Sequence, residues 1–101
     1  MLKKVFLGSK VSSIENEAFY HCVSLETVDC NGTAVIENIG SDAFSECSNL
    51  QNVDLGNKLN RIGEYAFYEC NSLTEIDLKN CADLETICSR AFLGCLDVKI
   101  L

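Results

Sequence analysis

The sequence has few basic residues and no long apolar run. Eight lysines and arginines stand against fifteen aspartates and glutamates, so the formal net charge is −7 at pH 7 and the pI is about 4.5. This charge repels nucleic-acid phosphates and anionic lipid headgroups. No apolar run approaches the roughly 18 to 20 residues that span a bilayer, and the apolar start of the chain breaks at Gly8 before a signal-peptide core is complete. We therefore expect no nucleic-acid partner, no membrane insertion and no signal peptide in this chain.

Histidine and the sequence motifs of catalysis are almost absent. His21 is the only histidine, and no C-x-x-C, G-x-S-x-G, P-loop, G-x-G-x-x-G or H-E-x-x-H pattern occurs. His21 and Cys22 are adjacent, but successive residues of a helical turn point about 100° apart, which disfavours a thiolate–imidazole pair. A zinc site would need scattered thiolates as its ligands. We expect no enzymatic activity, no cofactor and no bound metal.

The chain instead contains an internal repeat. An Ala-Phe pair recurs four times, at offsets of 25, 23 and 25 residues, and a cysteine stands three positions after each phenylalanine. The pairs are at 18–19, 43–44, 66–67 and 91–92, and the cysteines are Cys22, Cys47, Cys70 and Cys95. Because a unit of about 20 to 29 residues cannot bury its apolar face alone, this period predicts a solenoid.

Two further apolar blocks complete the repeat. Two apolar residues three positions apart precede each Ala-Phe pair, as Val11 and Ile14 do, and a Leu-x-x-Val-x-Leu block follows each cysteine, as at 50–55. The length varies only in the loop between the blocks, where insertions cost least. The single predicted domain, 1–101, divides into a partial repeat 1–10, repeats 11–35, 36–58 and 59–83, and a final incomplete repeat 84–101.

The repeated motif Ile-x-x-x-Ala-Phe-x-x-Cys-x-x-Leu-x-x-Val-x-Leu resembles the BspA-like, or Treponema pallidum-type, leucine-rich repeat over essentially the whole chain. The last unit departs from the motif, since a shorter block follows Cys95. The resemblance implies a right-handed leucine-rich-repeat superhelix without enzymatic activity. It also implies a protein-binding role, often within large surface-exposed or secreted antigens and adhesins, and so favours a cell-surface or secreted location.

The columns of the repeat predict an α/β solenoid with 23 to 25 residues per repeat. The period-two alternation in Leu-x-x-Val-x-Leu predicts one strand per repeat, stacked into a continuous parallel sheet on one face. Ile14, Ala18, Phe19 and Cys22 have the spacing of one side of a short helix. This spacing predicts short helical turns on the opposite face, with neighbouring repeats about 5 Å apart.

At this spacing the four repeated cysteines form a ladder of small side chains, which we expect to be buried as free thiols. Cys30 takes a strand position that leucine holds in other repeats, which again predicts a core residue. Cys81 and Cys88 lie outside these columns. The sequence leaves two interpretations for that pair: partly buried loop residues, or a disulfide or reactive thiol.

The x positions of the strand block face away from the core. They form the predicted partner-binding face: Lys4, Phe6, Thr27, Asp29, Asn52, Asp54, Glu75 and Asp77. Asp29, Asp54 and Asp77 stack in one column, which Lys99 is expected to continue. Because stacked like charges cost stability, this column is either a solvated ladder or a surface that selects a partner with a basic or mixed-charge surface. A flat ladder offers too few converging oxygens for a divalent cation.

Two functional hypotheses follow. The first is a non-catalytic protein–protein interaction module that binds through the exposed sheet face, and the alternative is a structural spacer with no ligand of its own. Tyr20, Tyr65 and Tyr68 offer another contact surface, although ring packing between neighbouring turns also explains them. The chain starts and stops within repeats, so we expect a segment of a longer array, and open sheet edges allow end-to-end self-association.

Overall fold

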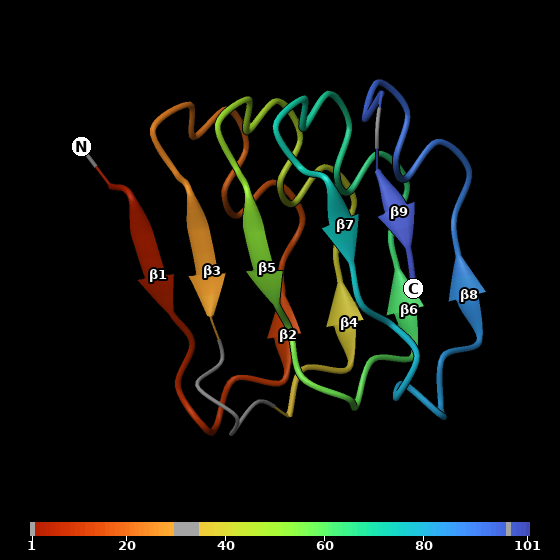
Figure 1. The fold of residues 1–101 in the computed structure, drawn as a ribbon. Helices are drawn as coiled ribbons and strands as arrows, with labels where there is room; N and C mark the ends of the chain where they lie inside the picture. Colours follow the sequence, from red (N-terminus) through yellow and green to blue (C-terminus); the bar gives the residue numbers. More distant parts are fainter. Residues whose placement is uncertain (1, 30–34, 97) are drawn as a thin grey trace.

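In the computed structural model the chain winds as a solenoid, and each coil contributes short parallel strands to two faces (Figure 1). The structure describes residues 2–29, 35–96 and 98–101. The strand position predicted for Cys30 lies outside these residues. The coils stack into a body of 28 × 27 × 22 Å. A solenoid of stacked repeats is therefore confirmed.

The first face carries the strands of the Leu-x-x-Val-x-Leu block. These strands are β1 (Lys4–Phe6), β3 (Thr27–Asp29), β5 (Asn52–Asp54), β7 (Glu75–Ile76) and β9 (Lys99–Ile100). β1, β3 and β5 form one parallel sheet, and β7 and β9 form a second. A strand at each of these blocks is confirmed, but the expected continuous sheet is wrong, because the ladder is interrupted between β5 and β7.

The second face is also a sheet, where the sequence predicts helical turns. Its strands are β2 (Ser13–Ile14), β4 (Asn38–Ile39), β6 (Arg61–Ile62) and β8 (Thr86–Ile87). They pair in parallel and in chain order, so this sheet runs through four coils. Ile39 and Ile62 are fully buried, and they reach the core as strand residues rather than from a helix.

The predicted helical turns are wrong, because residues 2–29, 35–96 and 98–101 contain no helix. Around each Ala-Phe pair the chain forms successive tight turns, as where Cys22 N–H donates to Phe19 O. His21, the third residue of that turn, has a φ of 58°, which is the geometry of a type II turn. The fold class is therefore an all-β solenoid in the described part of the chain, and not an α/β solenoid.

Alternate amides of these turns bond to the next coil. Phe19 N–H donates to Ala43 O and His21 N–H donates to Ser45 O, both at 2.8 Å. In a helix these amides would donate within the helix itself. Because the neighbouring coil supplies carbonyl acceptors next to these turns, the turn amides form hydrogen bonds without a helix. The same hydrogen bonds join the coils.

The core is built around a stack of phenylalanine rings. Successive ring centroids in this stack are 5.3 Å apart and the ring planes differ by 8° or less, in the order Phe19, Phe44, Phe67, Phe92. Phe44 and Phe67 are fully buried. The expected spacing of about 5 Å between repeats is confirmed.

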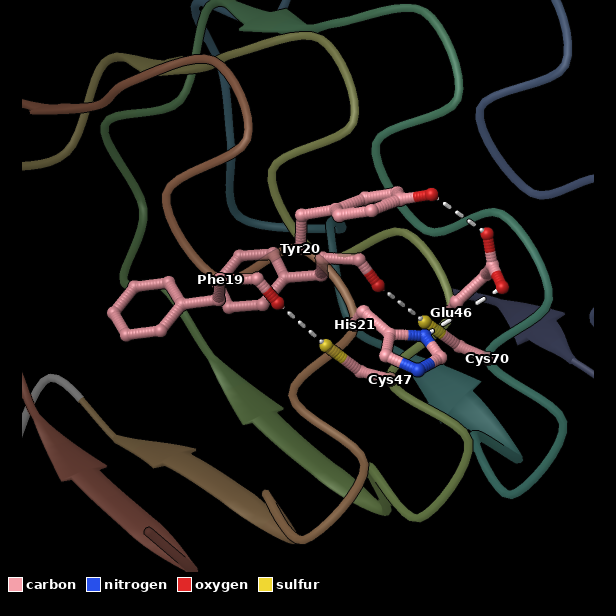
Figure 2. Close-up of polar contacts among 7 residues, drawn as sticks. Phe19, Tyr20, His21, Glu46, Cys47 and Cys70 are labelled. Atoms are coloured by element: carbon pink, nitrogen blue, oxygen red, sulfur yellow. Dashed lines mark hydrogen bonds and ion pairs between the residues drawn. The ribbon is translucent and has the colours of Figure 1, made fainter.

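The repeated cysteines lie beside this stack as free thiols. Three of them donate to the phenylalanine carbonyl of the preceding coil, in the pairs Cys47 Sγ to Phe19 O at 3.1 Å, Cys70 Sγ to Phe44 O at 3.1 Å and Cys95 Sγ to Phe67 O at 2.9 Å. Figure 2 shows the first two of these bonds. Burial is confirmed for these three cysteines, whereas Cys22 in the first coil is half-buried.

Cys81 and Cys88 are both free thiols, so the disulfide interpretation is wrong. Cys81 is buried, and its Sγ lies 3.7 Å from Gly56 O of the preceding coil. Cys88 is half-buried and follows β8 directly. Cys81 therefore belongs to the core, because its loop folds inward against the neighbouring loop.

The last strand pairs two residues away from its expected register. Lys99 lies opposite Glu75 and Ile100 lies opposite Ile76, whereas the sequence pattern predicts Lys99 in the column of Asp77. The final block is one residue shorter between its cysteine and this isoleucine than the preceding block is. This shortening carries Ile100 into the apolar column and moves Lys99 with it.

Candidate partner-binding face

The structure places the predicted face residues on the strands of the first face. Lys4 and Phe6 lie on β1, Thr27 and Asp29 on β3, Asn52 and Asp54 on β5, Glu75 on β7, and Asp77 just beyond β7. Strand pairing sets Lys4 beside Thr27 and Thr27 beside Asn52. It also sets Asp29 directly between Phe6 and Asp54. Side chains distant in the sequence thus form two rows across the coils.

A groove of about 380 Å³ crosses this face over β3, β5 and β7. Six of the eight predicted residues line it: Thr27, Asp29, Asn52, Asp54, Glu75 and Asp77. Val28 and Val53 contribute its apolar floor, and Gln51 and Thr74 lie at one end of the strands. Lys4 and Phe6 are outside the groove, on the edge strand. The groove thus combines this apolar floor with four carboxylates, and no lysine or arginine lines it among the described residues.

Two of the groove aspartates also hold the turns that follow their strands. Asp54 Oδ1 accepts the Gly56 N–H and Asp77 Oδ1 accepts the Lys79 N–H, both at 3.1 Å. A side chain that bonds the backbone two residues ahead forms an Asx turn. The repeated strand-end aspartate thus has a structural role that alternation along the strand does not predict. The Asp-x-Gly of 54–56 is the signal that would have indicated it.

Basic and aromatic groups flank the groove. Lys79 Nζ lies 3.6 Å from Asp77 Oδ2, and both side chains are largely exposed, so this ion pair contributes little to stability. Lys4 Nζ lies 5.3 Å from the centre of the Phe6 ring, which is 64% exposed. An exposed phenylalanine beside a lysine provides an apolar contact at the edge of the acidic face.

The turns on the other side of the solenoid carry a second polar group. Tyr20 Oη donates to Glu46 Oε2 at 3.1 Å, and His21 Nδ1 lies 3.6 Å from Glu46 Oε1 (Figure 2). The hydrogen bond to the Glu46 carboxylate raises the pKa of Tyr20. His21 thus faces a carboxylate of the next coil rather than Cys22, which leaves no thiolate–imidazole pair at this position.

The other two tyrosines pack against each other. The rings of Tyr65 and Tyr68 meet edge to face, with centroids 5.4 Å apart, and the Arg90 guanidinium lies 6.0 Å from the Tyr65 ring. Both tyrosines are half-buried, whereas Tyr20 is 47% exposed. The contacts favour ring packing for Tyr65 and Tyr68.

Histidine, cysteine and carboxylate side chains do not converge anywhere in the described residues as three or more potential metal ligands. The groove carboxylates come from three different coils of the solenoid. No helix in the described ranges is long and apolar enough to cross a membrane.

The comparisons with known proteins agree with this geometry. The model of the BspA type leucine-rich repeat region matches residues 1–101 in six copies. No curated protein matches the chain. A leucine-rich repeat protein from Bacteroides capillosus has a similar structure, with a TM-score of 0.78 and 24% identity over 97% of this chain and 76% of that one.

A second solved structure has the same fold. It is a leucine rich cell surface protein from Faecalibacterium prausnitzii, with a TM-score of 0.67 and 23% identity. The match covers 96% of this chain but only 31% of that protein. The family resemblance seen in the repeated motif is confirmed, and the chain belongs to the BspA-type leucine-rich repeat family.

Proposed function

We propose that this chain is a non-catalytic protein–protein interaction module that binds a protein partner through the sheet face around the groove. The groove is the observation that carries the proposal, because it collects six predicted face residues from three coils on one concave surface. Leucine-rich repeat proteins generally act as scaffolds for protein interactions. The repeat supplies the rigid support, and the outward side chains supply the specificity.

The chemistry of the face favours a partner with a basic or mixed-charge surface. The net charge of −7 and an acidic groove attract such a partner over distances of about 10 Å at moderate salt. Phe6, on the neighbouring edge strand, adds one exposed apolar contact. We place the module in a surface-exposed or secreted protein of the adhesin or antigen type, which the cell surface protein with the same fold supports.

The alternative function is a structural spacer that displays other domains. A spacer needs the stacked core but no particular outward residues, so neutral substitutions on the face would leave its role intact. Self-association through the end coils stays a prediction. Exposed apolar side chains at these ends, Phe6 and Leu96, favour it.

A charge-neutral variant of the face separates the two functions. Asp29, Asp54 and Asp77 are changed together to asparagine, which removes three charges but keeps the Oδ1 acceptor of the turns. The matched control changes Glu17, Glu64 and Asp83 to their amides, which removes the same charge elsewhere. Each protein is tested against binders selected from a displayed library of small protein domains.

We expect the selected domains to lose binding to the face variant and to keep binding to the control. Urea unfolding should show that the face variant is as stable as the parent, or more stable, because stacked like charges are relieved. Enrichment of no domain, or equal binding to both variants, would support the spacer and contradict the module.

A further inference from the structure

The repeated cysteines place one thiol at the same position of four successive coils. We call Cys22, Cys47, Cys70 and Cys95 the thiol column. The last three each donate to a phenylalanine carbonyl of the preceding coil, at 2.9 to 3.1 Å, and Figure 2 shows two of these bonds. Because the three side chains repeat the same contact, their sulfurs follow one another at the coil spacing, which hydrogen-bonded strands set at about 4.8 Å.

Neighbouring thiols of this column also interact with each other. A side-chain hydrogen bond with Cys95 raises the pKa of the Cys70 thiol. Burial raises the pKa of the Cys47 thiol to about 11, and the nearby charge of Cys22 acts in the same direction. Thiols of successive coils are therefore close together, although all four are free.

The spacing of the column is too wide for a disulfide and fits an ion between two sulfurs. A disulfide brings two Cβ atoms to about 3.8 Å, which stacked coils about 4.8 Å apart do not allow without a backbone shift. A metal–thiolate bond is about 2.3 Å long, so two such bonds in line span about 4.6 Å. An ion midway between two stacked sulfurs therefore needs almost no movement of the coils.

We propose that the thiol column binds soft metal ions such as Cu(I), each held in line between the sulfurs of two successive coils, so that four thiols take two ions. Soft thiolate ligands select Cu(I), and two opposite ligands keep the negative sulfurs farthest apart. Zinc needs about four ligands, and no three histidine, cysteine or carboxylate side chains converge in the part of the chain that the structure describes. This proposal departs from the expectation of no bound metal, because stacking brings together thiols that are scattered in the sequence.

Binding exchanges protons for the ion and transfers no electron. Two S–H groups release their protons to water and two Cu–S bonds form, which leaves one negative charge per ion. The Cys22 backbone bonds to the Cys47 sulfur and favours the thiolate over the thiol, and the same bond recurs from Cys70 to Cys95. The carbonyls that lose an S–H donor keep an N–H donor, as Phe19 O does from Cys22 N–H.

One end of the column opens to the surface. An apolar hollow of about 220 Å³ lies at the first coil, lined by Leu2, His21, Cys22, Val23 and Ser24. Cys22 is half-buried, whereas Cys47 in the next coil is fully buried. The Cys22 sulfur therefore provides the entry point for an ion.

The test counts Cu(I) ions on the full chain by native mass spectrometry, without oxygen and in competition with a Cu(I) chelator. Two double variants keep the same number of column thiols. Cys22→Ala with Cys47→Ala leaves two neighbouring thiols, and Cys22→Ala with Cys70→Ala leaves two thiols separated by a coil. Cys81→Ala with Cys88→Ala is the control outside the column. Urea unfolding shows whether each variant is folded.

We expect two ions on the parent and on the control, one on the variant with neighbouring thiols and none on the variant with separated thiols. X-ray absorption of the copper-loaded parent should show two sulfur neighbours per ion, a readout that needs no variant. No ion on the parent, equal binding by the two double variants, loss of binding in the control, or three sulfur neighbours would each overturn the proposal. None of these results depends on the sheet face, so the proposed function is tested separately.

Discussion

The repeated cysteine shows how one side chain serves both packing and backbone bonding. Its sulfur fills a small space beside the phenylalanine stack, and in three coils its Sγ donates to the carbonyl of the preceding coil. Burial raises the pKa of the Cys47 thiol from 9.0 to about 11. A buried neutral thiol is a poor nucleophile, which agrees with a structural role for the column.

This pKa predicts a loss of stability in alkaline solution. Between about pH 9 and about pH 11 the unfolded chain releases the Cys47 proton while the folded chain keeps it. The unfolded state then binds fewer protons, so the free energy of unfolding falls as the pH rises. Urea unfolding across this range should show a smaller fall in Cys47→Ala than in the parent. Equal slopes in the two proteins would contradict burial of this thiol.

The sequence predicts the cysteine column but not the partner of each thiol. The spacing of Cys22, Cys47, Cys70 and Cys95 indicates stacking, whereas the acceptor carbonyl lies about one repeat earlier and appears only when the coils are placed together. The burial of Cys81 is not predictable from the sequence for the same reason. Its place in the core depends on the neighbouring loop at Gly56, which no periodic column includes.

The turns show why a helical pattern is ambiguous over short segments. Apolar residues at i, i+4, i+5 and i+8 fit one side of a helix, and the same spacing arises when tight turns bring them to one side. The two-residue strands of the second sheet are too short to show a period of two. The next coil decides between a helix and tight turns, because its carbonyls accept every second amide N–H of this segment.

Glycine substitution at Glu69 distinguishes turns from helices. The φ of Glu69 is 55°, a region that costs a residue with a Cβ roughly 1 to 2 kcal/mol relative to glycine. We expect Glu69→Gly to be more stable than Glu69→Ala by about 1 kcal/mol, measured by urea unfolding. In a helix the order would be reversed by about the same amount, so a more stable alanine variant would contradict the turn structure.

Gly63 tests how closely the coils approach at the end of the second sheet. A Cβ added there would lie 2.7 Å from the carbonyl carbon of Gly40, which belongs to backbone and cannot move aside cheaply. We expect Gly63→Ala to lower the free energy of unfolding by about 1 to 3 kcal/mol. Gly8→Ala is the control, since a Cβ at Gly8 meets no atom within 4 Å. Equal effects of the two substitutions would show that the coils are further apart.

At the scale of the whole molecule, stability depends on stacking between neighbouring coils. Phe67 is fully buried between Phe44 and Phe92, with ring centroids 5.3 Å away on both sides. We expect Phe67→Ala to cost about 3 to 5 kcal/mol, because it leaves a cavity and breaks the stack. Phe6→Ala, on the exposed edge strand, should cost far less. A loss well under about 1 kcal/mol for Phe67→Ala would mean that the packing columns are wrong.

The candidate face was predicted only as far as alternation along a strand allows. The alternation of polar and apolar residues correctly predicts that Asn52 and Asp54 point outward on β5. This prediction uses the sequence of one repeat alone. The groove is lined by residues of three coils, and no residue pattern within a single repeat indicates it. Contacts between repeats therefore determine the site, as they determine the turns and the thiol bonds.

Site-specific photo-crosslinking tests most directly whether the sheet face binds a protein. A photoreactive side chain replaces Asn52 in the groove or Glu64 on the turn side, and each chain is mixed with cell-surface protein extract. We expect Asn52 to yield a distinct adduct that excess unlabelled chain abolishes, and Glu64 to yield none. Identical adducts from both positions, or none from Asn52, would contradict a partner-binding face on this solenoid.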